Sequence, residues 1–360
     1  MGDYMRILYA ASNMRHINNF HMPYIDSLRK MGHVVEVMAR GEGADYNIPF
    51  EKKLFSRQNA GCRERIHRIL ADERFDAIIL NTALAAFHIR LALPRNGRPT
   101  VLNIVHGYLF SRDIGFAKRV LFILCEWLLR SRTDRIITMN SEDQEWAESL
   151  KLSRYGARQS RGMGVRTRDV VTSPENIRCE YMLEGKYTLC FVGELSKRKN
   201  QKFLIDALRE LKCSLPNAVL LLVGDGGERE SLMRRAVRAG LSESVIFTGH
   251  RREACDFIRA SDLYVSASRI EGLPFNIVEA LGVGATVLAS DIKGHRDVIT
   301  DGVDGFLYKH GDALDFVNKC LQIAENKLEI MPENAKNKYE MFQYDSVFPE
   351  TLGLILKAVS

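Results

Sequence analysis

Short apolar runs alternate with longer amphipathic segments along the whole chain of 360 residues. The runs are rich in β-branched residues and have the length of strands, whereas the longer segments carry apolar residues at helical spacing. Strands that alternate with helices predict parallel sheets covered by helices on both faces, so the predicted fold class is α/β. The expected strands are 7–11, 34–38, 77–80, 100–105 and 135–139, then 188–192, 219–223, 245–247, 263–266, 286–289 and 306–308.

This length and a polar, irregular stretch in the middle of the chain predict two domains. We expect a doubly wound domain at 1–168, a linker at 169–185, a second doubly wound domain at 186–340, and a C-terminal helix at 341–360 that packs back on the first domain. Doubly wound sheets bind ligands beyond the carboxyl ends of their strands. Two such Rossmann-like domains are therefore expected to face each other across a cleft.

Composition is that of a globular chain, with 46% hydrophobic and 27% charged residues, which excludes disorder and fibrous architectures. The net charge of +6 is too small to indicate a nucleic-acid binder. It is unevenly spread: residues 1–170 hold 27 Lys and Arg against 18 Asp and Glu, and residues 171–360 hold 24 against 27. The basic first half either faces an anionic surface or substrate, or carries an excess of solvated arginine.

Seven cysteines, with no CxxC pair among them, support neither a zinc site nor a disulfide framework. The beginning of the chain lacks the apolar segment of a signal peptide, and no run has the length of a transmembrane helix. We therefore expect a cytoplasmic protein.

The segment 116–132 has cations at both ends and bulky apolar residues between them. It could be an interfacial helix on anionic lipid, or a helix packed on the first sheet with its basic ends in solvent. We favour packing for Phe122 and Leu129. The basic ends stay candidates for a peripheral contact with the inner face of the cell membrane.

Candidate chemistry is concentrated in 269–281. Gly272 and Pro274 prevent a continuous helix through Glu271, and Pro274 suits the start of a helix that carries Glu279. Free amides at 275–278 would then offer a site for a diphosphate, with a carboxylate on either side to hold hydroxyls. A sugar nucleotide has this layout, although two glutamates eight residues apart also occur by chance.

Glu271 and Glu279 lie within one of six motifs that follow one another in the second half of the chain. Together these motifs resemble family 4 of the retaining glycosyltransferases, which have the GT-B fold. The first half resembles the bacterial surface-polysaccharide branch of the family, less specifically. The second-half motifs are 191–195 with Lys199-Asn200, 223–226, 247–251, 261–262, 271–279 and 302–306, and the first-half motifs are 19–24, 105–108, 133–134 with 140–143, and 162–165.

The resemblance implies that the first half binds the acceptor and the second half the nucleotide sugar. Glu271 would contact hydroxyls of the transferred sugar, Glu279 would hold the ribose, and Lys199 would neutralise the leaving diphosphate, where charge develops. The implied catalytic residues are His106, Lys199 and Glu271. The implied donor-binding residues are Gly193, Arg198, Lys199, Gly249, His250, Arg251, Glu271, Gly272, Leu273, Pro274, Phe275, Asn276, Ile277 and Glu279, and the acceptor-side residues are Asn13, His16, His21, His106 and Gly107.

The activity that the resemblance implies is retaining transfer of a sugar, typically from a UDP-sugar, to a lipid-linked or other glycan acceptor in capsule or lipopolysaccharide biosynthesis. No cofactor and no metal are expected, since the leaving phosphate oxygen can take the acceptor proton. The glycine-rich 223–227 lacks the spacing of a phosphate loop, so a tight turn is the expected structure there.

One residue departs from the family pattern: Glu194 stands where an arginine commonly pairs with the lysine on the diphosphate. Either Glu194 turns away and Arg198 or Lys197 substitutes, or donor handling is impaired. The second case leaves open a catalytically silent subunit that only binds nucleotide sugars. A sugar-nucleotide 2-epimerase on the same fold is a further alternative, whereas oxidoreduction is disfavoured because 10–14 contains no glycine.

Overall fold

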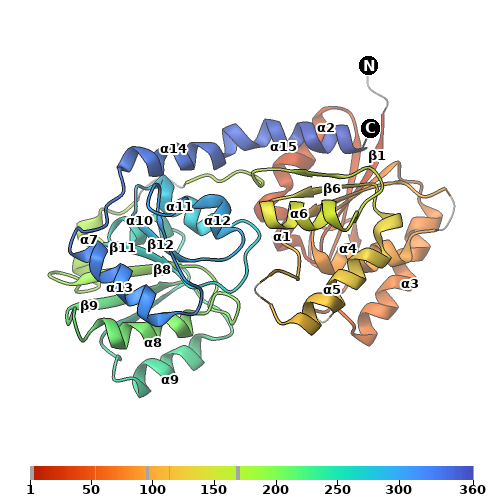
Figure 1. Ribbon diagram of the computed structural model, residues 1–360. Helices are drawn as coiled ribbons and strands as arrows, with labels where there is room; N and C mark the ends of the chain where they lie inside the picture. Colours follow the sequence, from red (N-terminus) through yellow and green to blue (C-terminus); the bar gives the residue numbers. More distant parts are fainter. Residues whose placement is uncertain (1–3, 53, 95–96, 113, 168–170, 360) are drawn as a thin grey trace. The chain divides into compact units, whose positions relative to one another are not determined.

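The computed structural model describes residues 4–52, 54–94, 97–112, 114–167 and 171–359. Their contacts divide the chain into two units, which are described separately (Figure 1). Unit 1 comprises residues 1–164 and 345–360, and unit 2 comprises 165–344. Each unit is built around one sheet.

The sheet of unit 1 is parallel throughout the described residues, with the order β3-β2-β1-β4-β5-β6-β7. Its direction of winding reverses between β1 and β4, and ligands of doubly wound sheets bind at such a point. The strands are β1 (Arg6–Ala10), β2 (Val34–Ala39), β3 (Tyr46–Asn47), β4 (Ala77–Leu80), β5 (Thr100–Val105), β6 (Arg135–Thr138) and β7 (Ala157–Gln159). The helices are α1 (Met14–Phe20), α2 (Met22–Lys30), α3 (Arg57–Asp72), α4 (Ala83–Ala92), α5 (Phe116–Leu128), the short 3-10 turn η1 (Arg130–Arg132), α6 (Ser141–Ser149) and α15 (Tyr344–Val359).

Unit 2 contains a parallel sheet of order β10-β9-β8-β11-β12-β13 within the described residues, and here the winding reverses between β8 and β11. The strands are β8 (Tyr187–Val192), β9 (Ala218–Val223), β10 (Val245–Gly249), β11 (Leu263–Ser266), β12 (Val287–Ser290) and β13 (Phe306–Tyr308). The helices are α7 (Pro174–Glu180), α8 (Gln201–Leu211), α9 (Arg229–Arg238), α10 (Ala254–Arg259), α11 (Phe275–Gly282), α12 (His295–Val298), α13 (Ala313–Ala324) and α14 (Pro332–Phe342).

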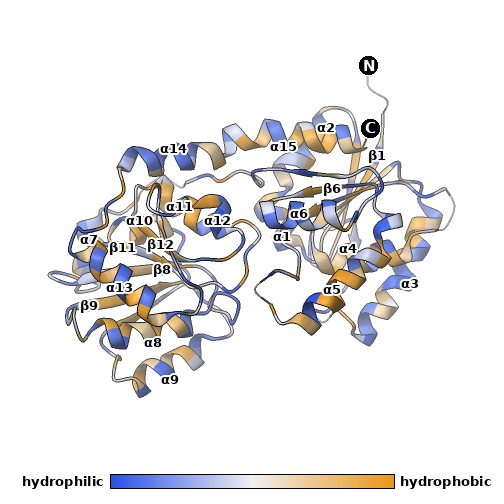
Figure 2. Ribbon diagram, in the orientation of Figure 1, coloured by the Kyte–Doolittle hydropathy of each residue, from blue (hydrophilic) through white to orange (hydrophobic). Residues whose placement is uncertain are grey.

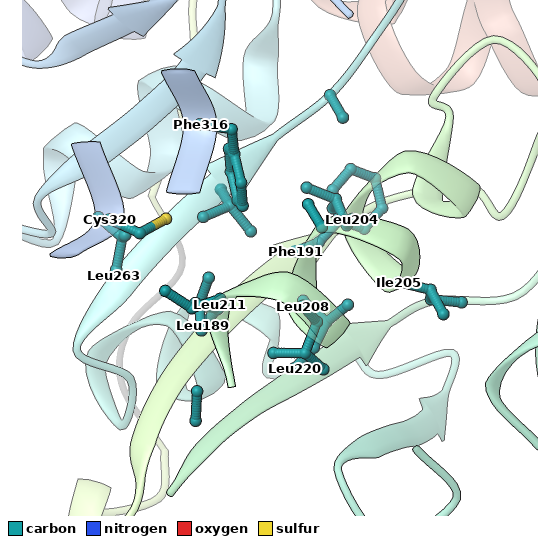
Figure 3. Packing of buried hydrophobic residues seen from close by; sticks show 14 of the residues in the cluster. Leu189, Phe191, Leu204, Ile205, Leu208, Leu211, Leu220, Leu263, Phe316 and Cys320 are labelled. Atoms are coloured by element: carbon teal, nitrogen blue, oxygen red, sulfur yellow. The ribbon is translucent and has the colours of Figure 1, made fainter. Parts of the chain in front are cut away.

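Hydrophobic side chains fix α8 and α13 on the sheet of unit 2. Phe191 and Leu220 from the strands pack with Leu204 and Leu208 of α8 and with Phe316 of α13 (Figure 3). The strands of both units are hydrophobic over most of their length (Figure 2), as expected for parallel strands buried on both faces. A rigid sheet therefore supports the loops at its carboxyl edge.

All eleven predicted strands are present, and two short edge strands, β3 and β7, are additional. The expected boundary at 168–169 lies outside the described residues. We expected a linker at 169–185, and its described part, from 171 onward, is not an irregular linker. Residues 174–180 form α7, which packs on α10 in unit 2. The Ser173 hydroxyl caps this helix by accepting from the Asn176 amide, and Ile177 is buried, so this part of the segment is folded.

The end of the chain is divided between the units, because α14 belongs to unit 2 and nearly all of α15 to unit 1. Polar contacts help to hold α15 in unit 1: Ser160 Oγ lies 2.6 Å from Thr351 Oγ1, and Arg161 Nη2 lies 2.6 Å from Glu350 Oε2. Helix α15 begins at 344, three residues after the start at 341 expected from the sequence, because 341–342 still belong to α14.

Candidate active site

The loops that follow β8 and β11 meet because these strands are parallel neighbours whose carboxyl ends share one edge of the sheet. The first loop carries Arg198 and Lys199, and the second carries Glu271. Lys199 Nζ lies 2.8 Å from Glu271 Oε1, and Arg198 Nη1 lies 2.6 Å from Glu271 Oε2. The structure thus brings together three of the predicted site residues in one ion-paired cluster.

Two members of this cluster are withdrawn from water, Glu271 at 6% and Lys199 at 8% exposed, whereas the Arg198 side chain is 44% exposed. Burial by itself would raise the pKa of Glu271, but the positive charges of Lys199 and Arg198 lower that pKa to about 2. Glu271 is therefore an anion at neutral pH. A buried carboxylate between two cations is suited to accepting hydrogen bonds from hydroxyls and unsuited to acting as an acid.

His295 at the start of α12 is a neighbour of Glu271 that sequence reasoning missed. Its Nδ1 lies 2.7 Å from the Ser290 carbonyl oxygen, and its buried Nε2 has no hydrogen-bond partner among the described residues. Burial lowers the pKa of His295 to about 4, although the Glu271 charge raises it. The position of its loop after β12, the strand beside β11, is the sequence signal that could have found it.

A glycine permits the approach of this loop to Glu271. Gly294 has a φ of +79°, and a Cβ there would lie 2.7 Å from the Gly272 carbonyl oxygen and 3.1 Å from that of Glu271. Any other residue at 294 would push the two loops apart. Gly294 therefore helps to fix the backbone from which the Glu271 side chain extends.

Asn276 in the first turn of α11 connects this helix to the cluster. Its Nδ2 donates to Tyr264 Oη at 2.7 Å and to the Val192 carbonyl at 3.1 Å, and its Oδ1 accepts from Lys199 Nζ at 3.5 Å. Asn276, which we predicted to bind the nucleotide sugar, thus positions Lys199 against the ends of β8 and β11.

The expectation of free amides at 275–278 is wrong for three of the four. The Phe275 amide donates to the Leu273 carbonyl, and the amides of Ile277 and Val278 both donate to Pro274. These bonds arise because α11 starts with a tight turn directly after Pro274. The side chains of Leu273, Pro274 and Ile277 are buried, whereas Gly272, Phe275 and Glu279 are half-buried.

Gly193 and the 223–227 segment form the tight turn expected from the sequence. A Cβ on Gly224 would lie 2.0 Å from the Gly193 carbonyl oxygen, so these loops touch through backbone atoms alone. Glu194 beside them is exposed, while Arg198 contacts Glu271. The second cation of the cluster therefore comes from Arg198 and not from position 194.

The predicted base-binding loop follows β10. Gly249 has a φ of +74°, and its carbonyl accepts from the Gly224 amide at 2.8 Å. His250 is exposed. Arg251 donates to Tyr181 Oη at 2.6 Å, and its other described contacts, with Glu253 and the ring of Phe257, also lie away from the ion-paired cluster.

In unit 1 the structure brings His16, His21 and His106 together. One ring nitrogen from each lies within 4.8 Å of the others, and His16 Nε2 is 3.2 Å from His21 Nε2. Asn13 is a helix cap, because its Oδ1 accepts from the His16 amide at 2.9 Å.

The loop after His106 is fixed by the motif at 140–143. Gly107 has a φ of +128°, and the next amide, that of Tyr108, donates to Asp143 Oδ2 at 3.1 Å. Asn140 donates to the same oxygen at 2.7 Å and caps α6. This first-half motif therefore holds in place the backbone that carries His106.

The preference for a packed helix at 116–132 is confirmed for Leu129, which is 4% exposed, and only in part for Phe122, which is half-buried. Of α5 itself, only Glu126 is buried. Its outer face exposes Phe116, Val120, Leu121, Leu124, Trp127 and Leu128 to between 41% and 72%. Among the described residues, no helix is both long and apolar enough to cross a membrane.

Comparison with known proteins shows the family to which the chain is related. Residues 174–340 match the family described as glycosyl transferases group 1. EpsD of Bacillus subtilis (strain 168), classed by its name with the glycosyltransferases, is 30% identical over 331 residues, which cover 88% of this chain and 87% of that protein. The UDP-Gal:alpha-D-GlcNAc-diphosphoundecaprenol alpha-1,3-galactosyltransferase of Escherichia coli is 24% identical over 285 residues, or 76% of this chain and 73% of the enzyme.

Solved structures show the same fold at lower identity. HepE of Anabaena in complex with UDP superposes with a TM-score of 0.73 at 20% identity, covering 98% of this chain and 100% of that one. Sucrose-phosphate synthase of Thermosynechococcus elongatus gives a TM-score of 0.76 at 17% identity, with 99% and 100% covered. Because each unit is an α/β unit with a parallel sheet, and a relative that is 30% identical covers 88% of the chain, the chain belongs to the group 1 glycosyltransferases and has the GT-B fold.

Proposed function

We propose that this protein transfers a sugar, with retention of anomeric configuration, from a UDP-sugar to a lipid-linked glycan in bacterial polysaccharide biosynthesis. The observation that carries the proposal is the buried Lys199–Glu271 pair at the winding reversal of unit 2. The relatives support the substrate classes, since one is named for transfer from UDP-Gal to a diphosphoundecaprenol-linked sugar and another was crystallised with UDP.

The ion-paired cluster suits the departure of a diphosphate. Lys199 and Arg198 are held beside one carboxylate, so a bound diphosphate gains two cations that need no new positioning. The bond between the anomeric carbon and the diphosphate oxygen breaks, and a bond from that carbon to the acceptor oxygen forms. The leaving phosphate oxygen takes the acceptor proton. Negative charge grows on the diphosphate as the bond breaks, so Lys199 lowers the barrier more than it tightens binding.

Glu271 in this proposal orients the transferred sugar by accepting hydrogen bonds from its hydroxyls. Its pKa of about 2 keeps it ionised, and ionised acceptors make the stronger hydrogen bonds. His106, Glu279 and the loop 249–251 keep the roles that the family resemblance implies, and no metal is required.

The test is a transfer assay with a panel of UDP-sugars and polyprenyl-diphosphate-linked sugars, scored by UDP release and by the anomeric configuration of the product. We expect Lys199→Met and Glu271→Gln to reduce kcat by at least about 100-fold. Lys202→Met, which removes an exposed lysine from α8, is the matched control and should keep wild-type rates. A silent subunit would bind donor without releasing UDP, an epimerase would release UDP and an altered sugar without acceptor, and an inverted product would refute retention.

We propose further that unit 1 docks on an anionic membrane surface through α5. The six exposed apolar side chains of this helix are accompanied by Lys118, Arg119 and Arg130, and the Arg130 guanidinium lies 4.2 Å from the centre of the Trp127 ring. Figure 2 shows α5 mostly in the colours of hydrophobic residues, interrupted by hydrophilic ones. A helix with apolar side chains and cations on its exposed surface fits the boundary between acyl chains and acidic head groups.

Liposome flotation tests the docking. We expect binding to vesicles that contain an anionic lipid, and a steep loss of binding as salt increases. Replacing Phe116, Leu124 and Leu128 by serine reduces the free energy gained when apolar side chains enter the membrane by about 3 kcal/mol. Binding to the vesicles should therefore fall about 100-fold. The control, Met233→Ser with Val237→Ser, removes exposed apolar residues from α9 of unit 2. Equal flotation of the two variants would refute the role of α5.

A further inference from the structure

We propose that His16, His21 and His106 form a binding site for a divalent transition metal of the Zn²⁺ class, with three imidazole ligands and one open coordination position. The three side chains come from separate places in the sequence: His16 lies in α1, His21 between α1 and α2, and His106 directly after β5. The cluster lies at the point where the sheet of unit 1 reverses its winding, because α1 follows β1 and β4 lies between β1 and β5.

The distances fit coordination. Zn²⁺ binds histidine nitrogen at about 2.0 Å, and tetrahedral angles then separate two ligand nitrogens by about 3.3 Å. His16 Nε2 and His21 Nε2 are 3.2 Å apart, and one nitrogen of each of the three rings lies within 4.8 Å of the others. The His16–His21 separation already matches this value, and on binding the three nitrogens would have to close from within 4.8 Å to about 3.3 Å.

Hydrogen bonds outside the cluster orient two of the rings. Tyr9 Oη lies 2.9 Å from His21 Nδ1, which fixes that ring with Nε2 toward His16. His16 is hydrogen-bonded to the backbone of Asn81, at the end of β4. Metal-binding histidines characteristically have such a partner on the other ring nitrogen. His106 gives the strongest indication of a metal, because its Nε2 is buried and has no hydrogen-bond partner among the described residues.

The chemistry of the three side chains indicates which metals would bind. Three imidazoles without a thiolate suit zinc, cobalt, nickel or copper and disfavour magnesium and calcium, which prefer oxygen ligands.

The site was not expected from the sequence, which offers no metal-binding spacing of the usual kind. It goes beyond sugar transfer, yet it shares His106 with the proposed catalytic residues. Metal on His106 would withdraw that side chain from transfer, so occupancy should inhibit the enzyme. The direct binding measurement below does not depend on the transfer reaction.

The experiment titrates the untagged, metal-free protein with Zn²⁺ by calorimetry and with Co²⁺ by visible absorption. We expect one equivalent of metal and the intense bands of tetrahedral cobalt. His16→Ala and His106→Ala should each weaken binding at least about 100-fold, and Tyr9→Phe about 10-fold. His67→Ala, at an exposed histidine of α3, is the matched control and should bind as wild type does.

The far-ultraviolet circular dichroism of each variant shows whether it folds, and His16→Asn replaces any variant that does not. Zn²⁺ binding of equal strength in wild type and folded His16 and His106 variants would overturn the proposal. So would a sulfur-to-cobalt charge-transfer band, since it would assign the metal to cysteines such as the exposed Cys179 and Cys213.

Discussion

Replacing Glu271 by glutamine keeps the shape of the side chain and removes the charge that neutralises Lys199 and Arg198. The pKa of Glu271 falls from the ordinary 4.5 to about 2 in the folded protein. At about 1.4 kcal/mol for each pKa unit, ionised Glu271 stabilises unit 2 by about 3 kcal/mol. Since Lys199 is 8% exposed, the variant leaves a buried cation with a weaker partner, which has a cost of the same order.

The contribution depends on pH in a defined direction. A carboxylate whose folded pKa lies below its unfolded pKa stabilises the protein above the unfolded value, and this stabilisation is lost as the pH falls toward the folded value. For Glu271 the window runs from about pH 5 down to about pH 2. The difference in stability between wild type and Glu271→Gln should therefore be constant from pH 7 to pH 6 and smaller by about 2 kcal/mol at pH 3.

Urea unfolding with two spectroscopic signals separates the units. Both tryptophans, Trp127 and Trp146, lie in unit 1, so their fluorescence reports that unit and circular dichroism reports both. We expect the dichroism transition of Glu271→Gln to shift and the fluorescence transition to stay at the wild-type midpoint. A stability difference that does not change between pH 7 and pH 3 would show that the Glu271 charge is not held by the two cations.

Two further substitutions test the packing around the two units. Gly294→Ala places a methyl group against the Gly272 carbonyl. It should lower the rate of transfer and should reduce the stability of unit 2 by about 1 to 3 kcal/mol. The control is Gly284→Ala, where φ is also positive but the space around the Cβ is open, so this variant should show only the cost of backbone strain. Equal losses of activity would refute the steric account. Glu126→Gln breaks the pair with the fully buried Arg90 and should destabilise unit 1 by about 3 kcal/mol in the fluorescence transition, while an unchanged midpoint would contradict it.

The strands could be predicted because parallel strands buried on both faces leave continuous apolar runs, as 219–223 does. The edge strand at 46–47 could not, since two residues have no period. The Lys199–Glu271 pair was within reach of motif spacing, whereas its buried neighbour His295 and the close approach at Gly294 depend on how three loops pack. The folded segment 174–180 was missed because Pro174 and Ser173 signal a turn and a helix cap equally well.

The central claim, that Lys199 in the ion-paired cluster contacts the diphosphate of the donor, is tested most directly by calorimetric affinities for UDP and for uridine. Because a charge-assisted hydrogen bond contributes about 1.5 to 3 kcal/mol, Lys199→Met should weaken UDP binding about 10- to 100-fold and leave uridine binding unchanged. Lys202→Met should bind both as wild type does. UDP affinity that is equal in the two variants would contradict the account.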